Sequence, residues 1–280
     1  MHTHLESLVN FFPLYILYNA DLLEIPDTDQ NEDAIGYVDD IAFIAIGATF
    51  TETTNKLQHL MEKENGGLDW SKTHNSRFEI TKSAIMHTSR IPTPNPENRR
   101  RTALQKPPLT INNQTISEVQ FYKYLGILVD SQLRWKEQDQ RAIANATKWL
   151  LQYRRLTKPS TGTSAKLMRQ LYLSVALPKI TYGLDVWFTP PNKKPSQTKN
   201  LGSAAVLHQL QKVQRIASLA ITGTLCTTPT PNDFADAHAG ILPIDLALCK
   251  ATHRAAIRLL TLPPSHPLHN IITSIKENPP

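Results

Sequence analysis

Hydrophobic positions follow two different patterns along the chain, and the change falls near residue 130. Before it, short apolar runs separated by polar turns predict β-strands, with two helices among them. One helix is expected over 13–25, with Pro13 in its first turn. Another should start at Thr49, where Glu52 completes a capping box, and stop at the glycines at 66–67. Beyond residue 130, apolar residues recur at the spacing of amphipathic helices.

Several stretches of the first part have the composition of strands. Residues 34–46 predict a β-hairpin with a tight turn at Val38-Asp39-Asp40, and residues 109–116 predict another that turns at two asparagines. A strand is expected over 78–87 and a further hairpin within 119–130. We expect these strands to form an antiparallel sheet.

The second part is expected to be helical. The predicted helices cover 136–157, 163–177, 203–222 and about 243–261. The second of them should bury Leu167, Leu171 and Val175 and lose its regularity at Pro178, and the Pro-rich stretch after the last should fray. The predicted fold class is therefore α+β, an antiparallel sheet with helices followed by an all-helical region.

Composition narrows the class of protein. With 280 residues, 40% of them hydrophobic, the chain can bury a sizeable core. No apolar run reaches the length of a membrane span, and the start lacks the basic region of a signal peptide. We therefore expect an intracellular protein, nuclear or cytoplasmic, without a membrane partner. Cys226 and Cys249 are too few for a disulfide framework, so no disulfide partner is expected.

The net charge of +6 is unevenly distributed. Residues 1–90 carry six basic and fourteen acidic side chains, whereas residues 130–215 carry fifteen basic and four acidic ones. A basic region of this size suits a polyanion, and nucleic acid is the first candidate. A helical surface that is merely solvated is the alternative. The candidate nucleic-acid-binding residues are Lys148, Arg154, Arg155, Lys166 and Arg169.

Asp39 and Asp40 stand side by side in the middle of the first predicted hairpin. Apolar strands on both sides would anchor the turn in a core and hold the two carboxylates at its tip. Adjacent carboxylates repel each other, and a divalent cation with a preference for oxygen ligands relieves that repulsion. The pair therefore predicts a weakly held Mg²⁺ or Mn²⁺ ion, with a solvated turn as the alternative.

Three motifs, taken together, resemble one family. Tyr37-Val38-Asp39-Asp40 between apolar strands resembles the catalytic hairpin of reverse transcriptases. Phe78-Glu79-Ile80-Thr81-Lys82 resembles their strand and loop with a functional lysine, and Tyr122-Lys123-Tyr124-Leu125-Gly126 resembles the segment that grips the primer end. Their order along the chain also agrees. Most of residues 14–270 resemble the palm and thumb of a non-LTR (LINE-type) retrotransposon reverse transcriptase, of the kind found in fungal copies.

The resemblance implies RNA-directed DNA synthesis on an RNA template with a DNA primer. Asp39 and Asp40 would be the catalytic metal ligands, and Lys82 would donate a proton to the leaving pyrophosphate. Residues 1–130 would be a partial palm, 131–222 a basic thumb-like region and 223–280 a helical connection with a Pro-rich tail.

The family's fingers and its first metal-binding aspartate have no counterpart ahead of the helix at Pro13. We therefore expect an N-terminally truncated copy that is inactive alone. The alternatives are a non-specific nucleic-acid-binding protein that uses the basic helices, and an unrelated Mg²⁺-dependent phosphohydrolase built on the aspartate pair.

Overall fold

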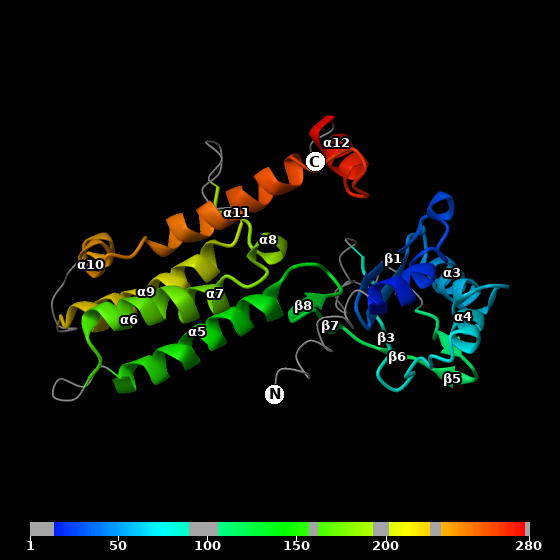
Figure 1. The fold of residues 1–280 in the computed structure, drawn as a ribbon, viewed down its shortest axis with the longest axis horizontal. Coiled ribbons are helices and arrows are strands. Elements are labelled where there is room, and N and C mark those ends of the chain that lie inside the picture. Colours follow the sequence, from blue (N-terminus) through cyan, green and yellow to red (C-terminus); the bar gives the residue numbers. More distant parts are fainter. Residues whose placement is uncertain (1–13, 90–105, 157–161, 193–201, 225–230, 278–280) are drawn as a thin grey trace, which may run out of the picture. The chain divides into compact units, whose positions relative to one another are not determined.

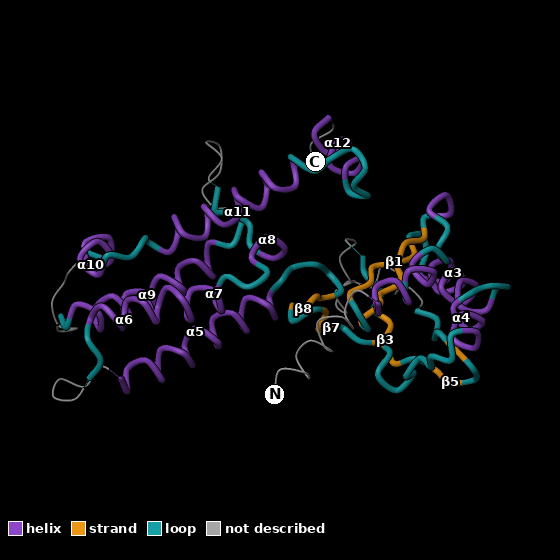
Figure 2. Tube along the Cα trace, in the orientation of Figure 1, coloured by secondary structure: helices purple, strands orange, loops and turns teal. Residues whose placement is uncertain are grey.

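The structure is a computed structural model and describes residues 14–89, 106–156, 162–192, 202–224 and 231–277. Its contacts divide the chain into two compact units, Met1–Arg134 and Trp135–Pro280. All described strands lie in the first unit, and the long helices of the second unit follow them in the chain (Figures 1 and 2). The mixed α+β class expected from the sequence is confirmed.

The first unit combines short helices with very short strands. Residues 14–18 are helical, and the helices that follow are α2 (Ala20–Leu23), the 3-10 turn η1 (Thr28–Gln30), α3 (Phe50–Glu62) and α4 (Gly67–Thr73). The strands are β1 (Glu32–Tyr37), β2 (Asp40–Ala45), β3 (Ala84–Ile85), β4 (Thr110–Ile111), β5 (Gln114–Thr115), β6 (Ser117–Glu118), β7 (Phe121–Tyr124) and β8 (Ile127–Asp130).

These strands form four separate two-stranded ladders, so the expectation of a common antiparallel sheet is wrong. Strands β1–β2, β4–β5 and β7–β8 are antiparallel hairpins, whereas β3 and β6 pair in parallel. The hairpin at the two asparagines is confirmed. Asn112 and Asn113 have φ angles of 51° and 59°, and a two-residue turn with positive φ at both positions is of type I′.

The expected strand over 78–87 is largely wrong. Only β3 is extended in a ladder, because residues 79–83 form a turn in which the Glu79 carbonyl accepts hydrogen bonds from the amides of Lys82 and Ser83. The helix expected over 13–25 is interrupted at Asn19, and its first residue lies outside the described ranges.

A hydrophobic core joins α3 to the short strands. Its buried members are Leu60, Met61, Ile85, Leu109, Ile111 and Ile116. The N-terminus of α3 is fixed as the sequence predicts, since Thr49 Oγ1 accepts a hydrogen bond from the Glu52 amide at 3.2 Å. An aromatic cluster extends from this core. Trp70 of α4 stacks on His74 with ring centroids 4.5 Å apart, and Tyr18 meets Trp70 edge-on.

The second unit is a helical assembly around one central helix. Its elements are α5 (Lys136–Leu156), α6 (Ala165–Leu171), the π-helical segment η2 (Tyr172–Ala176), α7 (Leu177–Ile180), α8 (Leu184–Trp187), α9 (Ala204–Thr222), α10 (Asn232–Ala239), α11 (Ile244–Leu260) and α12 (His269–Glu277). Helix α9 contacts α5, α6, α10 and α11 (Figure 1). Helix α12 occupies part of the stretch expected to fray, so that expectation is wrong for 269–277.

The segment from α6 to α7 differs from the expected helix by its register. Leu167 is 52% exposed, and the buried side chains are those of Met168, Tyr172, Ala176 and Ile180. A constant step of four residues would drift around a regular α-helix, and the wider π-helical turns of η2 reduce this drift. Pro178 does not end the helix, because it lies in the first turn of α7, where its missing N–H is tolerated.

A buried polar network joins η2 to α9 and α10. The Tyr172 hydroxyl donates a hydrogen bond to Gln214 Oε1 at 2.7 Å. Gln214 Nε2 donates to Asp236 Oδ2 at 2.6 Å and to the Leu242 carbonyl at 3.0 Å, and Ser218 Oγ donates to Asp236 Oδ1. Burial raises the pKa of Asp236, and the Ser218 and Gln214 hydrogen bonds partly oppose that effect.

Two further expectations concern membranes and cysteines. Within the described ranges, every helix is too short or too polar to span a lipid bilayer. Cys249 on α11 is a free thiol, and Cys226 lies outside the described residues.

Candidate functional site

The β1–β2 hairpin holds the two aspartates at its tip. Tyr37, the last residue of β1, pairs with Asp40, the first residue of β2, so that Val38 and Asp39 alone form the turn. Both carboxylates are exposed, as is the Tyr37 ring. The prediction of a tight turn that carries Asp39 and Asp40 is confirmed, with Asp40 belonging to the strand.

Val38 adopts a strained backbone conformation at this tip. Its φ angle of 57° lies in the left-handed region, which a β-branched side chain avoids. In a two-residue hairpin turn, a positive φ at the first position ordinarily selects glycine. The conformation costs about 1–3 kcal/mol and persists only where surrounding structure enforces it. Here, Asn19 Nδ2 donates a hydrogen bond to the Val38 carbonyl at 2.6 Å.

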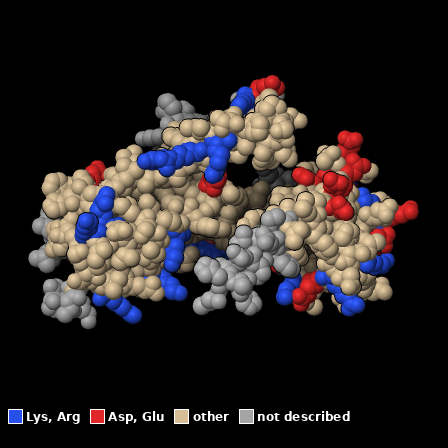
Figure 3. Space-filling view, in the orientation of Figure 1, with Lys and Arg blue, Asp and Glu red and all other residues tan. Residues whose placement is uncertain are grey.

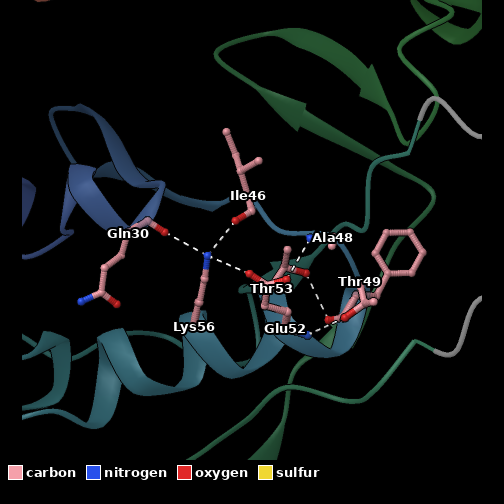
Figure 4. A network of polar contacts seen from close by, with 8 residues as sticks. Gln30, Ile46, Ala48, Thr49, Glu52, Thr53 and Lys56 are labelled. Carbon is pink, nitrogen blue, oxygen red and sulfur yellow. Dashed lines mark hydrogen bonds and ion pairs between the residues drawn. The ribbon is translucent and has the colours of Figure 1, made fainter.

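The base of the same hairpin is closed by Lys56 of α3 (Figure 4). Its ammonium group donates hydrogen bonds of 2.9 Å to the carbonyls of Gln30, ahead of β1, and Ile46, after β2. It also forms a 3.0 Å ion pair with Glu52, one turn earlier on α3. A hydrogen bond from the Ala48 amide and the Lys56 ammonium both lower the pKa of Glu52. The hairpin is therefore fixed at both of its ends.

One hydrogen bond links the β7–β8 hairpin, which carries the primer-grip candidate, to β1. The Tyr124 hydroxyl donates a hydrogen bond of 3.3 Å to the Ile35 carbonyl on β1. Partial burial raises the pKa of Tyr124, and the charge of Asp40 raises it further. Leu125 and Gly126 form the turn with φ angles of 45° and 83°. The structure thus brings two of the predicted site segments together.

Two other residues of the primer-grip candidate are exposed on the same hairpin. Tyr122 and Lys123 are exposed on β7. They pair in register with Val129 and Leu128 of β8, which are half-buried. The ladder therefore presents a tyrosine and a lysine to the solvent next to the turn.

Lys82 is placed in a surface turn rather than on a strand. Its ammonium forms a 2.7 Å ion pair with Glu79, and this contact raises the pKa of Lys82. Among the described residues, neither aspartate of the tip shares a hydrogen bond or an ion pair with Lys82. A raised pKa makes the ammonium a weaker acid, so a role as proton donor would first require its release from Glu79.

Asp39 and Asp40 are the candidate metal ligands at the tip. Two adjacent carboxylates supply ligands of the kind that Mg²⁺ takes from proteins, with water or phosphate oxygens completing the octahedron. The described part of the chain contains no group of three or more His, Cys, Asp or Glu side chains that could hold a metal. Asp39 and Asp40 by themselves do not fit the pair of ions that nucleotidyl transfer uses.

The predicted nucleic-acid-binding residues divide into different roles. Lys148, Arg155 and Lys166 are exposed on the second unit, where Lys and Arg side chains appear on the helices in Figure 3. The side chain of Arg154 is not among those that the structure describes. Arg169 has a structural contact, since its Nε donates a hydrogen bond to the Gly240 carbonyl at 2.8 Å and thereby caps the end of α10.

One helix face carries a regular row of cations. Arg141, Lys148 and Arg155 follow one another at intervals of seven residues on α5. Seven residues are close to two helical turns, so the three side chains lie in line, about 10 Å apart. The buried positions Ala142, Ala146 and Tyr153 occupy another side of the helix. Lys148 and Arg155 of this row are exposed, and Arg141 is half-buried.

Three residues at these candidate sites were not among the predicted site residues. Asn19 contacts Val38, which is 19 positions away in the chain, and Lys56 contacts Gln30, which is 26 positions away. No local sequence pattern predicts either contact. Arg141 could have been found from its seven-residue spacing to Lys148 and Arg155. No protein-family model, no curated protein and no solved structure matches the chain.

Proposed function

We propose that this chain is the palm-and-thumb part of a non-LTR retrotransposon reverse transcriptase that holds nucleic acid but does not extend a primer by itself. The observation that carries the proposal is the hairpin that presents Asp39 and Asp40 in a two-residue turn, with Tyr124 of the second motif bonded to its first strand. A turn that is merely solvated would not require Val38 in a strained conformation, nor the Lys56 hydrogen bonds that close the base of the hairpin. The nucleus or the cytoplasm would be the site of action.

The chemistry assigns a limited role to each part. Asp39 and Asp40 would hold one Mg²⁺ or Mn²⁺ ion, which when bound polarises a phosphate oxygen. The Tyr124 hairpin would position a strand end beside them. Polymerisation requires a second ion held by a further carboxylate, and the described residues offer no such ligand at this tip. Ion binding without template-directed synthesis is therefore the expected behaviour of the isolated chain.

The test compares the unmutated chain with an Asp39→Asn/Asp40→Asn variant in two assays. Binding of Mn²⁺, followed by electron paramagnetic resonance, should occur in the first and be lost in the second. Primer extension on an RNA template should be absent from both. The matched control is Asp33→Asn, which removes an exposed carboxylate from β1 of the same hairpin and should leave Mn²⁺ binding unchanged.

Two outcomes would contradict the proposal. Equal Mn²⁺ binding by the double variant would remove the tip as an ion site. Extension by the unmutated chain, lost in the double variant, would show that the chain supplies a complete catalytic centre. Hydrolysis of phosphate esters without any template would favour the phosphohydrolase alternative instead.

We infer a second candidate function, non-specific nucleic-acid binding, from the row of Arg141, Lys148 and Arg155. Cations in line along one helix can contact successive phosphates of a backbone without reading its sequence. Residues 135–280 carry eighteen basic and seven acidic side chains, which favours the same ligand. This function is compatible with the first and does not require the aspartate pair.

A further inference from the structure

The segment around α2 supports the aspartate hairpin from behind at two points. Asn19 lies just ahead of α2 and is only 6% exposed, and its side-chain amide reaches the Val38 carbonyl at the tip. Leu23 packs against Gly36 on β1 so closely that a Cβ atom at position 36 would lie 2.8 Å from Leu23 Cδ2. A larger residue at position 36 would therefore displace the Leu23 side chain.

Asn19 is itself held in place by its own helical segment. Its amide donates a hydrogen bond to the Tyr15 carbonyl at 3.1 Å, and its carbonyl accepts one from the Leu22 amide at 3.2 Å. Leu22 is completely buried, and Tyr18 packs edge-on against Trp70 of α4. The side chain that reaches the tip therefore extends from a backbone that is anchored in the first unit.

We propose that Asn19 is a positioning residue for the aspartate pair, and that its amide keeps Val38 in the left-handed conformation that directs both carboxylates to one ion. A carbonyl that accepts a hydrogen bond from a buried donor is fixed in direction, and this fixes the peptide plane between Val38 and Asp39. Without the donor, Val38 relaxes toward an extended conformation and turns the Asp39 side chain away from Asp40.

The inference rests on the proposed ion site for its affinity measurement and on the backbone alone for its second measurement. Asn19→Leu keeps the approximate size of the side chain and removes the donor. We expect it to weaken Mn²⁺ binding about tenfold, because the two carboxylates no longer converge. In a Val38→Gly background the same substitution should weaken binding less than about threefold, since glycine adopts positive φ without strain.

The second measurement is the conformation of Val38 by nuclear magnetic resonance. Its backbone chemical shifts and its intraresidue amide-to-Hα nuclear Overhauser effect distinguish left-handed from extended geometry. The left-handed signature should be present in the unmutated chain and lost in Asn19→Leu. The matched control is Ile111→Ala, which removes a buried side chain from the core of the first unit and should lower thermal stability while leaving the Val38 signature and the Mn²⁺ affinity of the folded protein unchanged.

The outcomes separate the two proposals. An unmutated chain that does not bind Mn²⁺ would remove the ion site, and the Val38 signature would then decide the role of Asn19 alone. Asn19→Leu with an unchanged Val38 signature and an affinity within about twofold of the unmutated chain would overturn the positioning role. Equal losses of affinity in the unmutated and the Val38→Gly backgrounds would also overturn it, because the effect would then not pass through the strained turn.

Discussion

Asp139 and Asp236 show two ways in which the helical unit accommodates an inward-facing carboxylate. Asp236 accepts hydrogen bonds from Gln214 and Ser218 on α9, so its burial is compensated by donors. Asp139 lies in the first turn of α5, and its Oδ1 is buried without a hydrogen-bond partner. Burial, together with the nearby charge of Glu137, raises the pKa of Asp139 to about 6.

This shift makes stability depend on pH in a defined direction. Asp139 binds its proton more tightly in the folded chain than in the unfolded one, so its contribution is complete below about pH 4 and is lost as the pH rises through about 6. Asp139→Asn is neutral at every pH. It should raise the free energy of unfolding by about 1 kcal/mol at neutral pH and leave it unchanged at about pH 4, since partial contact with water limits the effect.

Urea unfolding of both proteins at about pH 4 and about pH 7, followed by tryptophan fluorescence, measures the difference. Glu277→Gln removes an exposed carboxylate from the same unit and should change neither value. A stability difference of equal size at both pH values would show that the charge of Asp139 is not its cause.

At the scale of the element, the β1–β2 hairpin depends on α3. Lys56→Met keeps the aliphatic stem and removes the hydrogen bonds to the carbonyls of Gln30 and Ile46. We expect the free energy of unfolding of the first unit to fall by about 1–2 kcal/mol, because two carbonyls lose a charged donor. Hydrogen exchange of the hairpin amides should accelerate accordingly, and this is the measurement that checks it.

The control for Lys56 is an exposed lysine on the next helix. Lys72 forms a 3.1 Å ion pair with Asp69, and its side chain is 77% exposed. Lys72→Met should therefore change stability by less than about 0.5 kcal/mol. Equal effects of the two substitutions would mean that Lys56 contributes only as a surface cation.

The elements differ in how far the sequence could predict them. The hairpins at Val38 and at Asn112 were predictable, because β-prone apolar residues on both sides of a short polar stretch are a local signal. The inward face of α6 was not, since a π-helical segment changes the register without any marker in the composition. The strand expected over 78–87 failed because hydrogen bonds to the Glu79 carbonyl close a turn between its apolar residues at 78–80 and 84–86.

Only the candidate ligands and motif residues of the site were predictable from the sequence. Asp39, Asp40 and the Tyr124 segment carry recognisable motifs, and in the structure a hydrogen bond from Tyr124 links their two separate hairpins. The supporting contacts of Asn19 and Lys56 depend on which segments meet after folding. Residue type and spacing do not show which distant segments come into contact, so these contacts are visible only in the folded chain.

At the scale of the whole molecule, the two units carry opposite charge. Residues 1–134 contain twelve basic and seventeen acidic side chains, a net charge of −5, and residues 135–280 have a net charge of +11. Neutralising the cation row with Arg141→Gln, Lys148→Gln and Arg155→Gln should weaken binding to RNA and DNA alike. The slope of log affinity against log salt should flatten by about 2–3, close to one for each lost phosphate contact.

Fluorescence anisotropy with labelled duplexes over a range of salt concentrations measures this slope. The control variant removes the same charge from scattered positions, with Lys72→Gln, Lys212→Gln and Lys276→Gln. A control that flattens the slope as much as the row would show that only net charge matters. Absence of binding at low salt would leave the basic helices as a solvated surface.

The buried network of Tyr172, Gln214, Ser218 and Asp236 has a consequence for how this sequence can diverge. Loss of any one member leaves at least one neighbouring polar atom without that partner in the interior, and an unpaired buried polar group costs about 1–3 kcal/mol. Replacement of the whole set by apolar residues of matching volume can be nearly neutral. Single substitutions in this network are therefore selected against, whereas simultaneous replacement of all four residues is tolerated. The four positions should vary together or not at all across descendants of this chain.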